Sequence, residues 1–310
     1  MKHISIGLFG DVEDIGKELG KKGTSSDITL YDYKKGDDSV VFIEPIRYPE
    51  KIAPLIYTIN MMDYALVFIN EIKPEIGETL LALDISNEEK GFFVVGEYLD
   101  IENFKKIISN TSMKDFEILK RDSIQIREKM IGLDERDKSK SFTKISIDHF
   151  FAVKSVGTVI LGKIDKGNVK IHDSLRIYPT ENKASIKSIQ VQDKDVKDAG
   201  TNARVGLALK GILPDDLERG MILSDGELLI LDDLKLDMKW NPYSKKEIGV
   251  GEDYQIVIGL QLVAVRVENR KENIIKLKLI KPIVCENGDR VVLIDGSAKI
   301  RIIGISKVSI

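Results

Sequence analysis

A loop of the phosphate-binding type is the first feature of the sequence that could do chemistry. The apolar segment ISIGLFG leads into Gly10, and Gly16 and Lys17 follow after five intervening residues. In a working loop of the pattern G-x-x-x-x-G-K-[S/T], backbone N–H groups surround the phosphates, the lysine meets the β and γ oxygens, and the hydroxyl binds Mg²⁺. Here the glycines are one residue too far apart, and Glu18 stands where the hydroxyl belongs. The loop keeps the glycines and the lysine of a phosphate site, but it lacks their usual spacing and the hydroxyl that binds Mg²⁺.

The same loop is acidic. Asp11, Glu13 and Asp14 lie between the two glycines. Two like charges about 4 Å apart repel by about 4 kcal/mol at an effective dielectric constant near 20, so carboxylates beside a triphosphate weaken its binding. On these residues alone, an ordinary strand–loop–helix turn with a solvated acidic loop is the favoured interpretation.

The bulk composition limits the class of protein. The chain has 310 residues, of which 43% are hydrophobic and 31% charged, and this predicts two or three domains with sizeable cores. One cysteine excludes an intrachain disulfide and fits a reducing compartment. No segment approaches the roughly 20 apolar residues of a membrane span, and the N-terminal apolar run is too short for a signal peptide. A cytoplasmic protein is predicted. The net charge of −3 gives no field that would attract DNA, and neither DNA nor a membrane is an expected partner.

Strand and helix signals alternate over the first third of the chain. Apolar strands are predicted at ISIGLFG, ALVFIN and GFFVV, a β-hairpin around 34–38, and helices at 54–62, PEIGETLLALDIS, IENFKKIISN and SIQIREKMIGL. A short helix within DIGKELGKKG is expected to end at Gly23. Buried strands that alternate with helices predict a mostly parallel sheet with both faces covered.

Short strands with turn signals fill the remaining sequence. The polar segment 133–141 has no periodicity and is the predicted linker. Beyond it the pattern indicates β-structure with no convincing helix, and a weaker seam falls at 224–227. The sequence predicts three domains: an α/β domain over residues 1–136 and two β-barrels over 141–226 and 227–310.

The chain resembles the translational GTPases, and it is most similar to elongation factor Tu and the selenocysteine-specific branch. In the predicted barrels the resemblance rests on FFAVKSVGTV, KSIQV, ARVGLALKGI and the pattern Pro282, Glu286, Gly288, Arg290. In the first third, the family loop GHVDHGKT matches residues 10–18 apart from an extra Ile15 and the final Glu18. The resemblance implies a GTPase-like domain of the P-loop type followed by two all-β barrels.

On this alignment most residues that would hold a nucleotide are replaced. The family motif DVPGHE falls on 44–49, so Glu44 replaces the aspartate of the magnesium shell, and Arg47 and Tyr48 replace the glycine and histidine beside the γ-phosphate. Asp100 is the remnant of the guanine-reading NKxD motif. The relic nucleotide site comprises Gly10, Gly16, Lys17, Glu44 and Asp100. No catalytic or metal-binding residue is assigned and no cofactor is expected; GTP and Mg²⁺ belong to the chain only if the site still works.

A second candidate site lies in the first predicted barrel. In the family this barrel helps to hold the 3′ end of aminoacyl-tRNA, and the matching positions are Asp148, His149, Phe151, Gly157, Gln192, Asp193 and Arg204. Gln192 and Asp193 fall where elongation factor Tu has a His-Arg pair, and Arg204 falls where it has Asn. A guanidinium at this place can pair with a phosphate or another anionic group. In the second barrel, a basic stripe offers a further RNA-contact hypothesis: Arg266, Arg270, Lys276, Lys278 and Lys281.

Three functions are compatible with these features. The first is a pseudo-GTPase in or near translation whose barrels bind tRNA, other RNA, the ribosome or another translation factor. The second is an active GTP-binding elongation factor that delivers aminoacyl-tRNA. The third is a protein–protein adaptor with no RNA role. Magnesium-dependent GTP binding separates the second from the first, and RNA retained on purification separates the first from the third.

Overall fold

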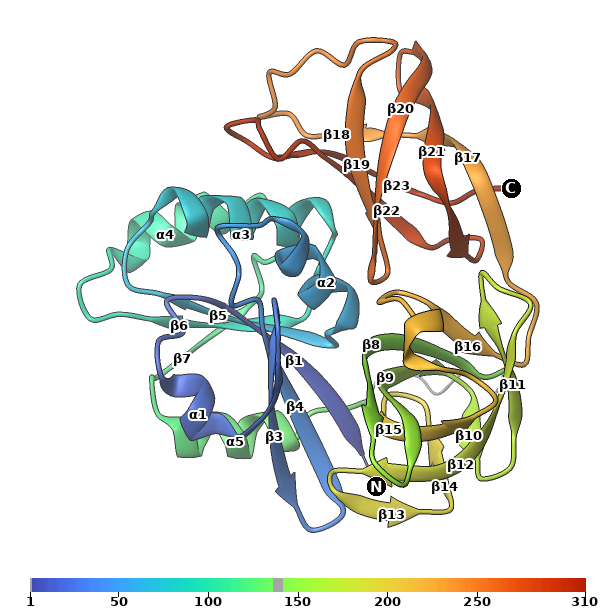
Figure 1. Ribbon diagram of the computed structural model, residues 1–310. Coiled ribbons are helices and arrows are strands. Elements are labelled where there is room, and N and C mark those ends of the chain that lie inside the picture. Colours follow the sequence, from blue (N-terminus) through green and yellow to red (C-terminus); the bar gives the residue numbers. More distant parts are fainter. Residues whose placement is uncertain (1, 136–141) are drawn as a thin grey trace. The chain divides into compact units, whose positions relative to one another are not determined.

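The chain divides into two compact units, Met1–Arg136 and Asp137–Ile310. The computed structural model describes residues 2–135 and 142–310, and Figure 1 shows each unit with its elements labelled. Most of the predicted linker, residues 136–141, lies outside the described residues. None of the helices in the described part of the chain is long and apolar enough to cross a membrane.

A seven-stranded sheet forms the centre of unit 1, in the order β2-β3-β4-β1-β5-β6-β7. The five strands from β4 to β7 in this order run parallel, and β3 and β2 join antiparallel at one edge. The predicted parallel sheet and hairpin are confirmed. The strands are β1 (His3–Gly10), β2 (Lys21–Ser25), β3 (Thr29–Lys35), β4 (Asp38–Glu44), β5 (Tyr64–Ile69), β6 (Gly91–Val95) and β7 (Glu117–Leu119).

Helices connect these strands and cover the sheet (Figure 1). They are α1 (Ile15–Leu19), α2 (Ala53–Met61), α3 (Pro74–Ile85), α4 (Ile101–Ile108) and α5 (Ser123–Ile131). The expectation that the first helix ends at Gly23 is wrong. The helix ends at Leu19 because the chain turns at Gly20, which is extended with φ −163°, and Gly23 already lies in β2.

The continuous apolar strands predicted for unit 1 bury both of their faces. Ile6, Leu8, Phe42 and Phe68 are fully buried in one core cluster. Burial at this level stabilises the domain by about 1.5–3 kcal/mol for each large apolar side chain. The buried sheet fixes the carboxyl ends of β1, β4, β5 and β6 at one edge, because parallel strands all end on the same side. This edge carries the relic nucleotide residues.

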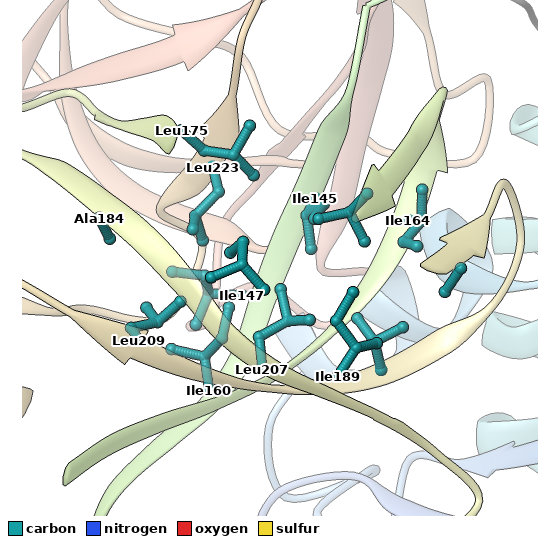
Figure 2. Packing of buried hydrophobic residues seen from close by; sticks show 14 of the residues in the cluster. Ile145, Ile147, Ile160, Ile164, Leu175, Ala184, Ile189, Leu207, Leu209 and Leu223 are labelled. Atoms are coloured by element: carbon teal, nitrogen blue, oxygen red, sulfur yellow. The ribbon is translucent and has the colours of Figure 1, made fainter. Parts of the chain in front are cut away.

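The first sheet of unit 2 closes on itself. The strands follow the order β11-β16-β8-β9-β15-β12, and β12 pairs back with β11, while β13 extends one side. Figure 2 shows the barrel interior, which is filled by aliphatic side chains such as Ile147, Ile160 and Leu207. The strands are β8 (Lys144–Val153), β9 (Gly157–Lys166), β10 (Asn168–Lys170), β11 (Ser174–Tyr178), β12 (Lys183–Val191), β13 (Lys194–Val196), β14 (Asp198–Gly200), β15 (Arg204–Lys210) and β16 (Ile222–Ser224), with one short 3₁₀ turn, Pro214–Asp216.

The second sheet of unit 2 has the order β17-β21-β20-β19-β22-β23-β18 and surrounds its own aliphatic core. Cys285 is fully buried in this core, and burial raises the pKa of its thiol to about 11. The single tryptophan, Trp240, packs at the edge of the same core under the guanidinium of Arg270. The strands are β17 (Leu229–Asp237), β18 (Lys239–Trp240), β19 (Asp253–Ile258), β20 (Gln261–Lys271), β21 (Ile274–Cys285), β22 (Arg290–Ile294) and β23 (Ile302–Lys307).

A buried ion network joins the two sheets of unit 2. The Lys144 ammonium, on β8, lies 2.8 Å from a Glu286 carboxylate oxygen and 3.4 Å from Asp289. Lys166 meets the other oxygen of Glu286 at 2.7 Å. Burial lowers the pKa of Lys144, but the Asp289 and Glu286 carboxylates outweigh it and leave that pKa raised. Lys144 and Glu286 are the most shielded members of the network, while Asp289 and Lys166 lie at its rim.

Candidate functional site

The loop after β1 has a backbone conformation that requires glycine at its first position. Gly10 has φ +79°, and a Cβ placed there would lie 2.1 Å from the carbonyl oxygen of Phe68. The loop therefore runs tightly against the end of β5. Ile15, the residue that lengthens the loop, is buried in the unit 1 core together with Val12. The extra residue is an anchor that binds the loop to the sheet.

The N–H groups of this loop donate to the chain itself. The Asp11 N–H donates to the Phe68 carbonyl at 2.9 Å, and the Val12 N–H donates to the Gly10 carbonyl at 2.8 Å. The N–H groups of Ile15 and Lys17 donate to the carbonyls of Val12 and Asp14. A phosphate-binding loop works because its N–H groups point at the ligand. Four of the donors between Asp11 and Lys17 are committed to protein carbonyls.

Tyr31 lies between the helix after the loop and the end of β4. A methyl group on Gly16 would meet its ring at 2.7 Å, and its hydroxyl donates to a Glu44 carboxylate oxygen at 2.7 Å. Burial raises the pKa of Glu44 despite this hydrogen bond, and burial and the Glu44 charge both raise the pKa of Tyr31. The carboxylate aligned with the magnesium shell of the family is thus held by a phenol of the same domain.

Two cationic side chains at the loop also have partners within unit 1. The Lys17 ammonium pairs with the Asp14 carboxylate at 2.6 Å. The Arg121 guanidinium, which follows β7, donates to the carbonyl oxygens of Asp11 and Val12 and to the Glu13 carboxylate at 3.0–3.3 Å. The same guanidinium lies 5.3 Å from the centre of the Phe68 ring. Arg121 carries no sequence signal for this contact, because its partners are more than one hundred positions away.

The Asp100 carboxylate is engaged at the start of a helix. Its side chain accepts a hydrogen bond from the Asn103 N–H at 3.0 Å and caps the N-terminus of α4. An aspartate at this position stabilises a helix by about 1 kcal/mol relative to alanine. Glu97 and Tyr98, which precede it, are exposed, and Tyr98 is 97% exposed.

The end of the sheet keeps part of a phosphate-binding frame and engages several of its groups within the chain. The loop keeps the strand, glycine and lysine of the frame and brings Gly10, Gly16, Lys17 and Glu44 to one end of the sheet. However, four of its N–H groups donate to protein carbonyls, Glu44 accepts a hydrogen bond from Tyr31, and exposed carboxylates lie on the loop. No group of three or more His, Cys, Asp or Glu side chains in residues 2–135 and 142–310 is arranged to hold a metal ion.

The barrel residues form a second, polar site. Arg204 on β15 donates to the Asp148 carboxylate on β8 at 3.0 Å, and Asp148 is 1% exposed at its side chain. The second oxygen of Asp148, Nδ1 of His149 and the amide nitrogen of Gln192 are buried without a hydrogen-bond partner among the described residues. Buried polar atoms in this condition cost about 1–3 kcal/mol each unless a ligand or water completes them.

Strand pairing explains how these residues meet. Gly162 pairs with Ile147 on one side and Val205 on the other, so β9 lies between Asp148 and Arg204. A Cβ on Gly162 would lie 2.4 Å from the Ser146 carbonyl, which shows a close approach of two strands. Gln190 pairs with Gly206, so β12 continues past Gly206 toward the Arg204 side of β15.

The other matching positions lie at turns or in the open. Gln192 and Asp193, with φ +50° and +59°, form the two-residue turn between β12 and β13. Phe151 is 41% exposed two residues beyond His149 on β8, and Gly157, with φ +105°, begins β9 at the end of the β8–β9 pairing. The structure brings Asp148 and Arg204 into contact, and sets Phe151 and Gly157 further along β8 and β9.

A basic hollow in the second sheet of unit 2 was missed by the sequence reasoning. It has a volume of about 400 Å³ and is lined by residues of two loops, among them Tyr243, Lys245, Lys246 and Lys299. Lys246 pairs with Asp295 at 3.3 Å, while Lys245 and Lys299 have no ion-pair partner in the described part of the chain. The predicted basic stripe is mostly neutralised: Arg266 pairs with Asp253, Lys276 with Glu268, and Lys281 with Glu218.

Comparison with known protein families decides the relationship. The family described as "Elongation factor Tu domain 2" matches residues 157–224, and "Initiation factor eIF2 gamma, C terminal" matches residues 235–308. A selenocysteine-specific elongation factor of Methanocaldococcus jannaschii is 29% identical over 308 residues, which cover 85% of this chain and 65% of that protein. The chain is thus homologous to the selenocysteine-specific elongation factors, and it contains an elongation factor Tu domain 2 and an eIF2 gamma C-terminal segment.

Within this family, a much closer relative is known. Uncharacterized protein MJ0325 of M. jannaschii is 59% identical over 307 residues, which cover 99% of this chain and 100% of the relative. A mouse selenocysteine-specific elongation factor is 27% identical over 140 residues, which cover 45% of this chain and 24% of the mouse protein. The chain spans less than two thirds of both elongation factors.

Solved structures show the shared fold of the family. Elongation factor SelB of Methanococcus maripaludis in complex with the GTP analogue GPPNHP matches 100% of this chain and 79% of its own with a TM-score of 0.85 and 22% identity. A bacterial selenocysteine-specific elongation factor matches 99% of this chain and 58% of its own with a TM-score of 0.84 and 19% identity. The GTPase-like α/β domain followed by two β-barrel domains, as predicted, is confirmed.

Proposed function

We propose that this elongation factor homologue binds RNA through its barrels, with the aminoacyl end of a tRNA as the first candidate, and works in the cytoplasm without a GTP cycle. The chain has the fold of a translation factor, and four N–H groups of the loop in its GTPase-like domain donate to carbonyls of the same domain. The proposed absence of a GTP cycle rests on this donation of loop N–H groups to protein carbonyls.

Phosphate binding at this loop would have to break existing contacts. Each committed N–H would exchange a protein carbonyl for a phosphate oxygen, and a cation at Glu44 would compete with Tyr31 for one carboxylate oxygen. Phosphoryl transfer depends almost entirely on positioned donors, a metal and an oriented water. Four N–H groups of the loop already donate to protein carbonyls, which supports a pseudo-GTPase.

The polar barrel site supports binding of an anionic or polar group. The Asp148 carboxylate accepts from the Arg204 guanidinium at 3.0 Å and so fixes a positive charge at the end of the barrel strands. His149 and Gln192 add buried atoms that lack partners, and these are free to recognise a ligand. Two relatives are named selenocysteine-specific elongation factors, and a selenolate is a small anionic group of the kind that such a site suits.

The basic hollow supports contact with a phosphate backbone. Lys245 and Lys299 come from separate loops, have no partner among the described residues, and lie beside the exposed ring of Tyr243. Unpaired lysines with an aromatic ring are a common combination at RNA surfaces. Because each phosphate contact releases counterions, binding through this hollow has to weaken as the salt concentration rises.

Two titrations test the proposal. The purified protein is titrated with a fluorescent GTP analogue with and without Mg²⁺, and no binding is expected up to about 1 mM, which is a free energy weaker than about −4 kcal/mol. Micromolar, Mg²⁺-dependent binding would refute the pseudo-GTPase half and favour an active GTP-binding factor.

The second titration uses bulk tRNA, aminoacylated and deacylated. The double variant Lys245→Ala/Lys299→Ala is expected to weaken binding of both forms and to reduce the salt dependence. Arg204→Met is expected to weaken the aminoacylated form alone. The matched control Arg266→Met removes a surface cation that already has a partner and should bind as the wild type does. If the wild type binds neither form, the RNA half is wrong and the adaptor function is favoured.

A further inference from the structure

Large apolar side chains are exposed where strands β5 and β6 end. Ile72 follows β5 and is 45% exposed, Tyr98 follows β6 and is 97% exposed, and Ile101 begins α4 and is 39% exposed. Exposed single residues are ordinary on a protein surface. These three, however, belong to two loops that leave adjacent strands, and tyrosine is among the residues enriched at the energetic centres of protein interfaces.

The two loops are held side by side by the backbone. Ile69 pairs with Val95 at the end of the β5–β6 ladder, and the Gly96 N–H donates to the Ile69 carbonyl at 2.8 Å. A Cβ on Gly96 would lie 2.8 Å from the side chain of Asn70, so the chains stay close as they leave the sheet. Ile72 and Tyr98 therefore project from neighbouring points of one edge.

Carboxylates surround these apolar groups. Glu71, Glu75, Glu97 and Glu102 are all exposed on the same two loops and the first turns of the following helices. Glu71 pairs with Lys73 and Glu102 with Lys105, whereas Glu75 and Glu97 have no ion-pair partner among the described residues. The negative charge opposes a nucleotide or any RNA phosphate at this edge, and it attracts a cationic partner before contact.

We infer that this edge, defined by Ile72, Tyr98 and Ile101 with their four glutamates, is a docking surface for a lysine- and arginine-rich segment of another protein. The apolar side chains of such a segment would pack on Tyr98 and Ile72, and its cations would meet Glu97 and Glu75. This inference is independent of the RNA-binding proposal, because it uses no residue of the barrels.

A peptide titration tests the inference on the full chain. The probe is a fluorescent 16-residue synthetic peptide of alternating lysine and leucine, compared with peptides that carry serine for leucine or glutamate for lysine. The expected result is binding of the lysine–leucine peptide that weakens with salt and falls at least about tenfold in Tyr98→Ser and in Glu97→Lys. Ile280→Ser is the matched control, because Ile280 is a 72% exposed isoleucine of unit 2.

Several outcomes would overturn the inference. One is no peptide binding by the wild type at about 1 mM, and another is equal binding by Tyr98→Ser, Glu97→Lys and the wild type. Loss of tRNA binding in Tyr98→Ser would assign the edge to nucleic acid instead. Concentration-dependent dimerisation of the wild type, abolished by Tyr98→Ser in analytical ultracentrifugation, would assign it to a second copy of the chain. Because Tyr98 is exposed, its substitution leaves the core intact.

Discussion

Replacement of Lys144 by methionine provides a severe test of how unit 2 is stabilised. The side chain of Lys144 is 9% exposed and its ammonium faces the carboxylates of Glu286 and Asp289. Methionine keeps the length of the stem and removes the charge. Glu286 would retain Lys166, but Asp289 and the nearby buried carboxylate of Asp165 would lose a cation that offsets their burial.

The expected loss is large because a buried charge is left without its counter-charge. Breaking such a pair by removing one partner costs about 3–5 kcal/mol. With an m-value of about 2 kcal/mol per molar urea, this moves the unfolding midpoint down by roughly 1.5–2.5 M. Fluorescence of Trp240, the single tryptophan of the chain, follows unfolding of the second sheet of unit 2 directly.

The control is Arg266→Met, which breaks a pair whose two side chains are 58% and 61% exposed. An exposed pair contributes about 0.2–1 kcal/mol, so its midpoint should move by less than about 0.5 M. In a double-mutant cycle, Lys144→Met with Glu286→Gln should cost about 1–3 kcal/mol less than the two single changes together. A Lys144→Met midpoint no lower than that of Arg266→Met would refute the reasoning.

Three further predictions concern single positions. Gly10→Ala should destabilise unit 1 by more than about 2 kcal/mol, because a Cβ would clash with the Phe68 carbonyl. Gly36→Ala, at φ +62° with open space around it, should cost only about 1 kcal/mol of backbone strain. Thermal unfolding followed by circular dichroism compares the two variants. Asp100→Ala should lower the same stability by about 1 kcal/mol, and Asp100→Asn should retain it, since asparagine caps helices equally well. Burial raises the pKa of Glu286, but hydrogen bonds from two lysines outweigh burial and hold that pKa below 4.5. The ionised carboxylate therefore stabilises the fold fully above pH 4.5, and this stabilisation is lost as the pH falls through the folded pKa. The stability difference between wild type and Glu286→Gln, measured by urea unfolding, should therefore shrink on acidification; a difference that is constant with pH would contradict it.

The parallel sheet was predictable because its strands are continuous apolar runs between helical segments, and this pattern is local. The connection between β21 and β22 contains Asn287-Gly288, a pair typical of tight turns, and Gly288 has φ +90° there. The end of α1 was not predictable from Gly23, because the chain leaves the helix to pair with β3, and this pairing depends on residues some ten positions later.

The candidate site residues were likewise predictable only where the sequence signal is local. The spacing of Gly10 and Lys17 predicted the strand–loop–helix frame and its place on the sheet. It could not predict that the Phe68 carbonyl accepts from the loop, or that Arg121 covers it, because those partners come from β5 and from the segment after β7. The basic hollow was missed for a similar reason: Lys245 and Lys299 lie 54 positions apart and meet only when the sheet curls.

The burial of Cys285 has a practical consequence for chemistry on this protein. A thiol with a pKa near 11 inside a closed core is protonated at neutral pH and out of reach of maleimides and disulfide reagents. The natural surface therefore offers no competing nucleophile of this kind, since the chain contains one cysteine. A cysteine introduced at Tyr98 or at Lys299 becomes a unique attachment point for a spin label or a photo-crosslinker, and the two candidate surfaces can be probed separately without altering the native sequence elsewhere.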